Sequence, residues 1–323
     1  MKLLRISITD RCQLRCLYCM PNDGIDFYPK QDTLSPDHIM AVATAARKVG
    51  ITHFKITGGE PLVRHDILDI VRRLKALEPT DLSMTTNGLM LPKLAEPLKA
   101  AGLDRLTISL DSFRNHTFQQ IASRHQTYSL EDVLTGIQAA ENAGFHHIKV
   151  NTVIIGGIND EQVHEIAAIT LLKDWTVRFI EYMPLGNAAL VEDDSVNTQT
   201  HVVSNEIIKT RIESHFGPLL ATDRTAEVGV GPAIIYQIPG AAGRLGFISA
   251  MSQPFCENCN RLRLTAKGEL RACLFDGGEI DLLPILEKSN NTDAIIEQMA
   301  QCIREKPLQH SSRGNRAMNQ LGG

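Results

Sequence analysis

The chain has 323 residues, of which 43% are hydrophobic and 22% are charged, and its formal net charge is −4. These values predict an ordinary globular protein with one large domain and an appended segment. The slight negative charge argues against a general nucleic-acid-binding protein, although a local basic pocket remains compatible with it. No run approaches about 18 apolar residues, so no membrane span is expected.

The first half of the chain alternates short β-like runs with helical patterns. Strands are predicted at residues 3–8, 53–57, 82–85, 106–110, 148–155 and 177–182. Helices are predicted between them at residues 36–49, 67–77, 91–101, 129–142 and 160–171. The first of these has Ser35 and Pro36 at its start and Gly50 at its end, as capped helices do.

Six successive β–α steps imply a parallel sheet with right-handed crossovers. Periodicity alone leaves two arrangements open, a doubly wound sheet and a partial barrel. In both, ligands bind where the carboxyl ends of the strands meet. The alternation stops near residue 187, which predicts a division into residues 1–187 and 188–323.

The second region is predicted to hold a helix at residues 203–215, short strands at 233–237 and 245–248, and a helix at 292–304. Its chemistry is concentrated between Cys256 and Cys273. The chain has seven cysteines, and its N-terminal residues lack the apolar segment of a signal peptide. We therefore expect a cytoplasmic protein with reduced thiols and no disulfide framework.

Cys12, Cys16 and Cys19 follow directly after the first predicted strand. Three thiolates at this spacing can hold three irons of a [4Fe–4S] cluster and leave the fourth iron open to a small molecule. A zinc site is the alternative, but no nearby histidine offers a fourth ligand. An aromatic residue, Tyr18, precedes the last cysteine.

A second set of three cysteines consists of Cys256, Cys259 and Cys273. It could be part of a zinc ribbon, which needs a fourth ligand, or it could hold a second [4Fe–4S] cluster with an open iron. Cys302 falls inside a predicted helix and is interpreted as an inert buried thiol. Arg261 and Arg263 point to the same side if their segment is extended, where they could stabilise an anionic substrate or the cluster.

Further candidates fall at strand ends, and each has an ordinary alternative. The Gly58-Gly59 turn could admit a ligand or be a plain β–α turn. Ser109 and Asp111 could bind ribose hydroxyls or cap a helix, and Met183 could simply be packing. Four cations, each of which could be a solvated charge, would suit a polyphosphate if they converge: Arg5, Lys55, Lys149 and Arg178.

Taken together, the sequence resembles the GTP 3',8-cyclase family of radical S-adenosylmethionine (SAM) enzymes. The resemblance is carried by residues 4–12, 19–21, 57–61, 85–88, 178–181, 255–263 and 273–275 and by the final Gly322-Gly323. It implies an α/β fold, a partial (β/α)6 TIM-like barrel with a C-terminal α+β domain that carries a second iron–sulfur cluster.

The resemblance also implies ligand contacts. SAM would bind the first cluster near Tyr18, Gly59, Ser109 and Met183. GTP would contact Arg5, Lys55, Thr85, Lys149, Arg261, Leu262 and Arg263, with its purine at the second cluster. Arg261, Arg263, Gly322 and Gly323 would assist catalysis.

The implied reaction converts GTP to 3',8-cyclo-7,8-dihydroGTP, the first step of molybdenum cofactor biosynthesis. A 5'-deoxyadenosyl radical would remove hydrogen from ribose C3', and C3' would then bond to guanine C8. The implied partners are a downstream cyclic pyranopterin monophosphate synthase, an external electron donor and a second copy of the chain, with no membrane and no nucleic acid. Two alternatives stay open: another twin-cluster radical SAM enzyme that acts on a peptide, and a non-enzymatic metal-binding structural protein.

Overall fold

The computed structural model describes residues 1–22, 26–122, 127–192, 201–222, 229–276, 279–288, 291–311 and 313–322. Within these ranges the strands are β1 (Leu3–Ser7), β2 (His53–Thr57), β3 (Asp81–Thr86), β4 (Arg105–Ser109), β5 (Lys149–Ile154), β6 (Thr176–Glu181), β7 (Leu220–Ala221), β8 (Ile234–Gln237), β9 (Arg244–Ile248), β10 (Arg261–Leu264), β11 (Glu269–Arg271) and β12 (Ile280–Asp281). They form one sheet in the order β12-β11-β10-β1-β2-β3-β4-β5-β6-β9-β8-β7.

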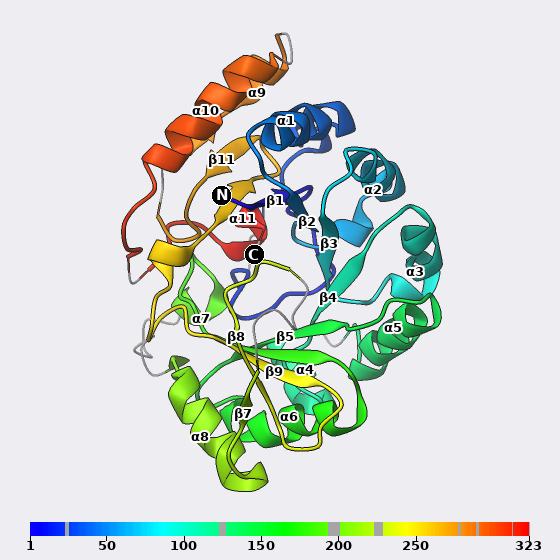
Figure 1. The fold of residues 1–323 in the computed structure, drawn as a ribbon, viewed down its shortest axis with the longest axis vertical. Coiled ribbons are helices and arrows are strands. Elements are labelled where there is room, and N and C mark those ends of the chain that lie inside the picture. Colours follow the sequence, from blue (N-terminus) through cyan, green and yellow to red (C-terminus); the bar gives the residue numbers. More distant parts are fainter. Residues whose placement is uncertain are drawn as a thin grey trace.

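The helices of the same ranges are α1 (Pro36–Lys48), α2 (Ile67–Lys75), α3 (Leu91–Ala100), α4 (Asn115–Ile121), α5 (Leu130–Asn142), α6 (Val163–Leu172), α7 (Ala189–Glu192), α8 (Asn205–Phe216), α9 (Leu283–Leu286), α10 (Thr292–Arg304) and α11 (Met318–Leu321). The sheet curves into an incomplete ring, and α1, α2, α3, α5 and α6 lie around its outside (Figure 1). None of the described helices is long and apolar enough to cross a membrane.

Consecutive strands β1 to β6 are neighbours and pair in parallel, which excludes a doubly wound order. The expected partial barrel is therefore confirmed. Ser35 caps α1 by accepting a hydrogen bond from the His38 amide at 3.2 Å, and Gly50 follows the helix with φ of +83°. These are the start and stop signals that the sequence predicted.

Alternation along the strands separates two faces of the ring. Arg5, Lys55 and Arg263 lie next to one another in register and line the interior cavity. Their neighbours Leu4 and Phe54 are fully buried on the other face, in the core between the strands and the outer helices. The polar face therefore lines the inside of the ring, and the apolar face binds the helices.

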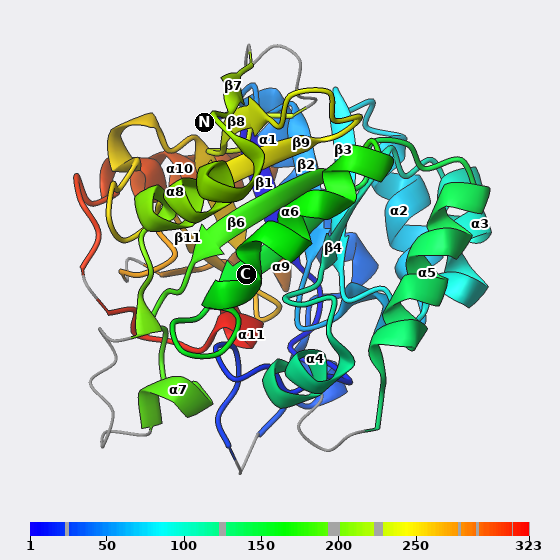
Figure 2. The same cartoon turned by 90° about the horizontal axis from the view of Figure 1, so that it is seen from below.

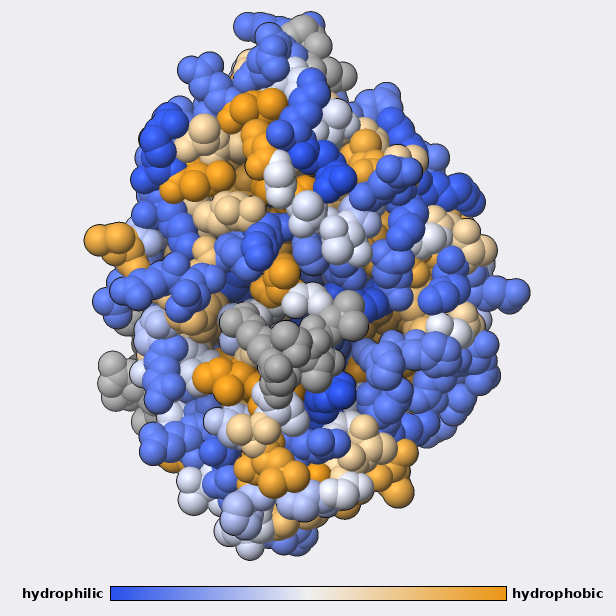
Figure 3. Space-filling model, in the orientation of Figure 1, coloured by the Kyte–Doolittle hydropathy of each residue, from blue (hydrophilic) through white to orange (hydrophobic). Residues whose placement is uncertain are grey.

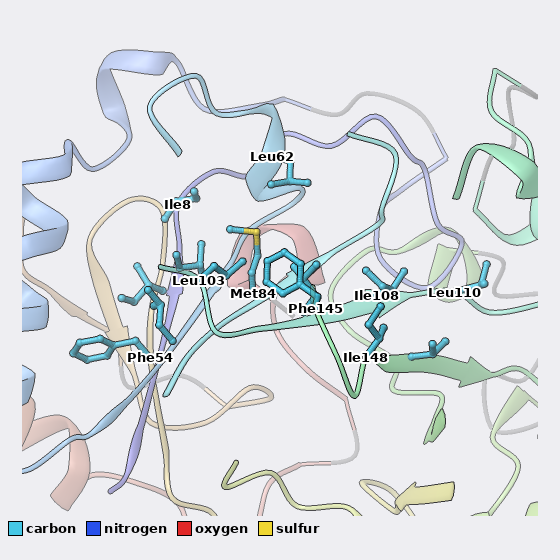
Figure 4. Packing of buried hydrophobic residues seen from close by; sticks show 14 of the residues in the cluster. Ile8, Phe54, Leu62, Met84, Leu103, Ile108, Leu110, Phe145 and Ile148 are labelled. Carbon is cyan, nitrogen blue, oxygen red and sulfur yellow. The ribbon is translucent and has the colours of Figure 1, made fainter. Parts of the chain in front are cut away.

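The main hydrophobic core lies in the layer between sheet and helices. Figure 4 shows Met84, Ile108 and Phe145 among its residues. On the face of the molecule drawn in Figure 3, hydrophilic residues predominate and hydrophobic ones form small groups. The apolar residues of the chain thus stabilise the ring from outside and leave its interior for polar side chains.

The C-terminal region continues both edges of the barrel sheet. Strand β10 pairs in parallel with β1, and β9 pairs in parallel with β6. Antiparallel strands then extend each side, β11 and β12 beyond β10 and β8 and β7 beyond β9. The division at residue 187 therefore separates two regions of one continuous sheet, and it stays a prediction as a domain boundary.

Candidate active site

The interior of the ring holds a cavity of about 230 Å³ that runs along its axis. At the carboxyl ends of the strands it is lined by Cys12, Cys16 and Cys19. At the amino ends it is lined by Asp81 and Arg105 among others. Ligands that enter this space therefore contact the residues of many strands at once, as in other barrels.

The loop of the first three cysteines is fixed at the carboxyl end of β1. The amide of Leu17 donates to the Ile121 carbonyl at 2.9 Å, and the amide of Leu190 donates to the Leu17 carbonyl at 3.1 Å. Arg15 donates through Nη1 to the Cys12 carbonyl at 2.6 Å. Figure 2 shows α4, α7 and α11 gathered at this end of the barrel.

The Gly58-Gly59 turn packs against this loop. The amide of Gly59 donates to the Thr9 carbonyl at 2.6 Å. A side chain at Gly59 would overlap the backbone of Asp10 and Arg11, and a Cβ on Gly58 would lie 2.6 Å from the Thr9 oxygen. The two glycines are therefore required because the cysteine loop passes directly over them.

The three thiols line one cavity, where they could serve as the ligands of an iron–sulfur cluster. Among the described residues, no group of three or more His, Cys, Asp or Glu side chains is placed to share one ion. Each thiolate of a [4Fe–4S] cluster binds its own iron, so wider spacing is required there. Burial raises the pKa of Cys12 to about 12 and also raises the pKa of Cys16 and Cys19. Thiolates at these positions therefore need a bound metal to stabilise their charge.

Tyr18 is held by Asp111, which follows β4. Its hydroxyl donates to Asp111 Oδ2 at 2.9 Å, and the amide of Val153 donates to Asp111 Oδ1 at 2.9 Å. Burial raises the pKa of Asp111 to about 6, against the effect of these two hydrogen bonds. The pair fixes the aromatic ring beside the cysteines and joins the loop to β4 and β5.

Glu60 joins the loops that follow β2 and β3. Its carboxylate accepts hydrogen bonds from the Leu62 amide at 3.0 Å, the Thr86 hydroxyl at 2.8 Å and the Asn87 amide at 2.6 Å. Burial raises its pKa to about 7. The Asn87 side chain in turn donates to the Cys12 sulfur at 3.7 Å. Glu60 thus orients a residue that contacts a cluster cysteine.

Cations dominate the remaining wall of the cavity. Among the described residues, seven lysines and arginines line it, against three acids: Arg5, Lys55, Arg105, Lys149, Arg178, Arg261 and Arg263, against Glu60, Asp81 and Asp111. Burial, and then repulsion by neighbouring cations, lowers the pKa of Arg5 and Lys55. So much positive charge is costly to bury without an anion, which favours a polyanionic ligand.

Hydrogen bonds and an ion pair join several side chains of this wall. Thr107 accepts from Lys55 Nζ at 2.9 Å and from Arg178 Nη2 at 3.3 Å, and Asp81 pairs with Arg105 at 2.6 Å. Thr85 Oγ1 and Asn151 Oδ1 line the same cavity, and both are buried without a hydrogen-bond partner. Buried polar atoms of this kind indicate a missing ligand or water.

The second set of cysteines lies on the far side of the same arginines. Cys256, Cys259 and Cys273 line a cavity of about 80 Å³. This cavity shares five lining residues with the larger one: Met183, Ile248, Arg261, Arg263 and Leu274. The two sets of thiols thus face two cavities that share a wall.

Lys306, which follows α10, holds the second cysteine loop. Its Nζ donates to the Cys256 carbonyl at 3.2 Å and to the Cys259 carbonyl at 2.6 Å. Burial would raise the pKa of Cys259, but the charge and hydrogen bonds of Arg261, aided by Lys306, lower it to about 7. This thiol therefore ionises near neutral pH.

The structure brings most of the predicted residues together. The large cavity is lined by Arg5, Cys12, Cys16, Tyr18, Cys19, Lys55, Gly59, Thr85, Ser109, Lys149, Met183, Arg261 and Arg263. Leu262 differs, because alternation along β10 places its side chain in the core on the opposite face. Gly322 lies within reach of Arg263, and Gly323 lies outside the described residues.

Several residues of the site were not singled out as site residues from the sequence. Asn87 belongs to residues 85–88, which carry the family resemblance, but no local pattern places it beside Cys12. Lys306 reaches the second cysteine set from a distant segment, and the Gly229–Pro232 stretch lines the cavity from a part of the chain with no regular pattern. Their positions at the site depend on the tertiary fold, so only the chemical type of each side chain could have marked them as candidates. Cys302 is buried in α10, as predicted, and its inertness stays a prediction.

Comparison with known proteins gives a consistent result over the whole chain. The radical SAM superfamily model matches residues 6–169, and the model for the C-terminal domain of molybdenum cofactor synthesis proteins matches residues 175–312. The chain is 42% identical to the GTP 3',8-cyclase of Pelotomaculum thermopropionicum, covering 99% of this chain and 97% of that protein. It is also 42% identical to the GTP 3',8-cyclase of Trichormus variabilis, covering 99% of this chain and 98% of that protein.

Solved structures are similar in fold at low sequence identity. Streptococcus suis SuiB bound to S-adenosylmethionine superimposes with a TM-score of 0.60 at 13% identity, over 90% of this chain and 64% of that one. SuiB bound to precursor peptide SuiA superimposes with a TM-score of 0.58, over 96% of this chain and 74% of that one. Because identity is so low, these likenesses support the fold alone.

The family models and the relatives agree with a barrel whose interior cavity is lined by the first set of cysteines. A radical SAM domain implies a [4Fe–4S] cluster and SAM, and the first cysteine set faces the cavity as such a site requires. The name of the relatives implies GTP as the substrate. The reading as a non-enzymatic structural protein is therefore wrong, and the chain belongs to the GTP 3',8-cyclase family of radical SAM enzymes.

Proposed function

We propose that this chain converts GTP to 3',8-cyclo-7,8-dihydroGTP, the first step of molybdenum cofactor biosynthesis, with SAM and two [4Fe–4S] clusters. The observation that carries the proposal is the wall of cations between the two sets of cysteines. Arg261 and Arg263 line both cavities, so a ligand held by them lies between the two thiol sets. The relatives that share the whole length of the chain have this activity by name.

The first cluster and SAM would occupy the carboxyl end of the barrel. Cys12, Cys16 and Cys19 would hold three irons, and the bound cluster would supply the electron that cleaves SAM to a 5'-deoxyadenosyl radical. SAM would lie against Tyr18, Gly59, Ser109 and Met183, all of which line the cavity. The hydrogen bond from Tyr18 to Asp111 would keep that aromatic ring from turning away.

The triphosphate of GTP would bind the cations of the inner wall. Arg5, Lys55, Thr85 and Lys149 line this part of the cavity. Phosphate oxygens would neutralise charges whose burial is otherwise costly, and they would accept the hydrogen bond that Thr85 Oγ1 lacks. Leu262 would contribute through its backbone only, because its side chain belongs to the core.

The purine would lie at the second cluster, held by Cys256, Cys259 and Cys273. Arg261 and Arg263 would then lie beside both the nucleotide and that cluster, where they orient the ribose for hydrogen removal at C3' and closure onto guanine C8. Arg263 Nη1 donates to the Gly322 carbonyl at 3.3 Å, so the C-terminal segment would also reach this region. We assign catalytic roles to Arg261, Arg263, Gly322 and, beyond the described residues, Gly323.

The proposal implies partners that the chain itself does not supply. An external one-electron donor must reduce the first cluster, and a cyclic pyranopterin monophosphate synthase must consume the cyclised nucleotide. We also propose a homodimer. A peptide substrate is not favoured, because the likeness to SuiB extends to the fold alone, and the cavity wall carries the charge of a polyanion site.

The test is anaerobic. Reconstituted enzyme receives SAM and a strong reductant, and 5'-deoxyadenosine is quantified with and without GTP. We expect about eight irons per chain, GTP-dependent deoxyadenosine and a cyclised GTP product. ATP in place of GTP is the matched control for recognition of the purine base. With ATP, the amount of 5'-deoxyadenosine should stay at the level formed without nucleotide. Cleavage of SAM that is indifferent to GTP would contradict the substrate, and no cleavage with eight irons present would contradict the mechanism.

A further inference from the structure

The cavity of the second cysteine set is lined in part by a short segment that follows α10. Helix α10 ends at Arg304, and Pro307 cannot continue it, because proline has no N–H to donate. Lys306, Pro307 and His310 all line the cavity. Residues 306–310 are called the bracket segment below.

Helix α10 fixes the place where the bracket segment begins. Its residues Ile295, Met299 and Cys302 are buried and belong to the main hydrophobic core. The helix lies on the outside of the ring, beside α1 and β11 (Figure 1). The bracket segment is therefore attached to the barrel through a packed helix.

Lys306 binds both ends of the turn that carries the first two cysteines of this set. Its Nζ donates to the Cys256 carbonyl at 3.2 Å and to the Cys259 carbonyl at 2.6 Å. The Cys259 amide donates to the same Cys256 carbonyl at 3.1 Å, which closes a single turn of 3-10 helix. The ammonium thus holds the backbone at both cysteines and so restrains the separation of their sulfurs.

His310 contacts the chain on the other sides of the same cavity. Its ring is stacked on Phe275, with the ring centres 4.1 Å apart and the planes inclined by 12°. Phe275 follows Cys273 by two residues. The His310 Nε2 donates to the Ala250 carbonyl at 2.8 Å, in the segment between β9 and Cys256. The bracket segment therefore contacts the surroundings of all three cysteines.

The charges around this cavity favour a bound anionic group. Among the described residues that line it are Arg261, Arg263 and Lys306, but no Asp or Glu. Three cysteines line the same space, and as iron-bound thiolates they would carry the opposite charge. A nearby cation lowers the free energy of such a negative group, and it does so more strongly away from water. The ammonium of Lys306 and the three thiols thus fit one iron–sulfur cluster.

We propose that Lys306 and His310 are positioning residues of the second cluster. They hold its three cysteines in the arrangement that keeps a [4Fe–4S] cluster bound beside the substrate cavity. Replacement of residues that orient metal ligands typically lowers metal affinity or activity by about 10-fold to 100-fold. This inference rests on the proposed function, since it requires a second cluster.

The test variant is Lys306→Met, which keeps an unbranched side chain of similar length and removes the ammonium. Lys306→Arg restores a cation with several donors and should recover most of the wild-type behaviour. His310→Ala removes the stacked ring and its hydrogen bond to Ala250. Arg304→Met is the matched control, because Arg304 is an exposed cation at the end of α10.

The measurement is the rate at which each cluster of the reconstituted holoenzyme loses iron to a chelator. The first cluster is recognised by an electron paramagnetic resonance signal that changes when SAM is added. We expect Lys306→Met and His310→Ala to lose the second cluster about 10-fold to 100-fold faster than wild type. The first cluster should keep its rate in every variant, since only a general weakening of the fold would accelerate the loss of both.

The outcomes separate the inference from the function beneath it. Cys259→Ala must lower the iron content from about eight to about four per chain, because one of two four-iron clusters loses a ligand. Wild-type protein that never holds more than about four irons would overturn the proposed function and the inference together.

If Cys259→Ala loses the second cluster but Lys306→Met and His310→Ala release it at the wild-type rate, only the inference fails. Equal acceleration at both clusters in Lys306→Met would also overturn the inference. In that case the whole fold, and not the second cluster, would depend on Lys306.

Discussion

Single residues in this molecule act through charges that the fold brings together. Arg5, Lys55 and Lys149 come from three strands and face one another inside the barrel. Taken alone in the sequence, each of these residues could be an ordinary solvated cation. That the three come together was expected only because a parallel sheet was predicted. The alternation of Arg261 and Arg263 around Leu262 was readable from the sequence. The partners Glu60 and Asn87 were not, since no local pattern places them beside Cys12.

Replacement of Lys55 by Met should raise the KM for GTP by about 10-fold to 100-fold, because a hydrogen bond to a charged group contributes about 1.5–3 kcal/mol. Methionine is unbranched and nearly as long as lysine, so the barrel should fold. Lys48→Met, at the exposed end of α1, is the matched control and should leave the KM unchanged. Initial rates against GTP concentration check this. An unchanged KM in Lys55→Met would contradict a phosphate site on the inner wall.

In iron-free protein, Cys259 should react with iodoacetamide faster than the other cysteines at pH 7. Its pKa of about 7 means that half of it is thiolate there, against about 3% for a thiol of ordinary pKa 8.5. The rate should rise with pH and level off above the pKa. Peptide mapping of alkylated protein between pH 5 and 9 measures this.

The same alkylation experiment on Arg261→Met tests whether Arg261 lowers the pKa of Cys259. Loss of the neighbouring cation leaves burial to dominate and so raises the pKa of Cys259. Alkylation at pH 7 should then fall several-fold and recover at higher pH. A profile that is unchanged by the substitution would show that Arg261 does not stabilise the thiolate.

Elements of the chain were predictable where the pattern was long. Strands β1 to β6 and helices α1, α5 and α10 agree with the sequence to within a few residues at each end. Short elements such as α4, α7 and α11 were not predicted, because four to seven residues carry too little periodicity. Helices α4 and α7 bind the loop of the first three cysteines through backbone hydrogen bonds. Because neither helix was predicted, the sequence did not show what holds this loop in place.

Helix α5 is placed by a glycine in its middle. A side chain at Gly136 would overlap the carbonyl oxygen of Gly88, which follows Asn87. Gly136→Ala should therefore destabilise the protein by about 1–3 kcal/mol, although alanine is the better helix former. Urea unfolding of the iron-free protein measures this.

Thr135→Ala is the control for helix propensity, because Thr135 is exposed on the same helix. It should change the free energy of unfolding by no more than about 0.5 kcal/mol. If Gly136→Ala were as stable as Thr135→Ala or more so, the close approach of α5 to the loop after β3 would be wrong. The loop that carries Asn87 would then owe its position to other contacts.

At the scale of the whole molecule, the C-terminal region extends the barrel sheet at both edges. The sequence separated two regions by the loss of β–α alternation near residue 187. It could not show that β9 and β10 return to opposite edges of the same sheet, since pairing partners that are distant in sequence leave no local signal. The two cysteine sets meet across Arg261 and Arg263 because β10 lies beside β1.

A fragment of residues 1–187 should therefore fail to fold alone. It would leave β1 and β6 as exposed edge strands, with the hydrogen bonds to β10 and β9 unmade. Co-expression of residues 188–323 should restore soluble, cooperatively unfolding protein. Circular dichroism during heating distinguishes the cases, and a cooperative transition in the isolated fragment would contradict the prediction.

The central claim is that one cavity brings the ribose of GTP to the radical generated at the first cysteine set. The most direct measurement uses GTP deuterated at C3' and follows the label by mass spectrometry of 5'-deoxyadenosine. The account predicts one deuterium in the deoxyadenosine, accompanied by the cyclised nucleotide. Unlabelled deoxyadenosine formed at the same rate would contradict it, because hydrogen would then come from another position or another molecule.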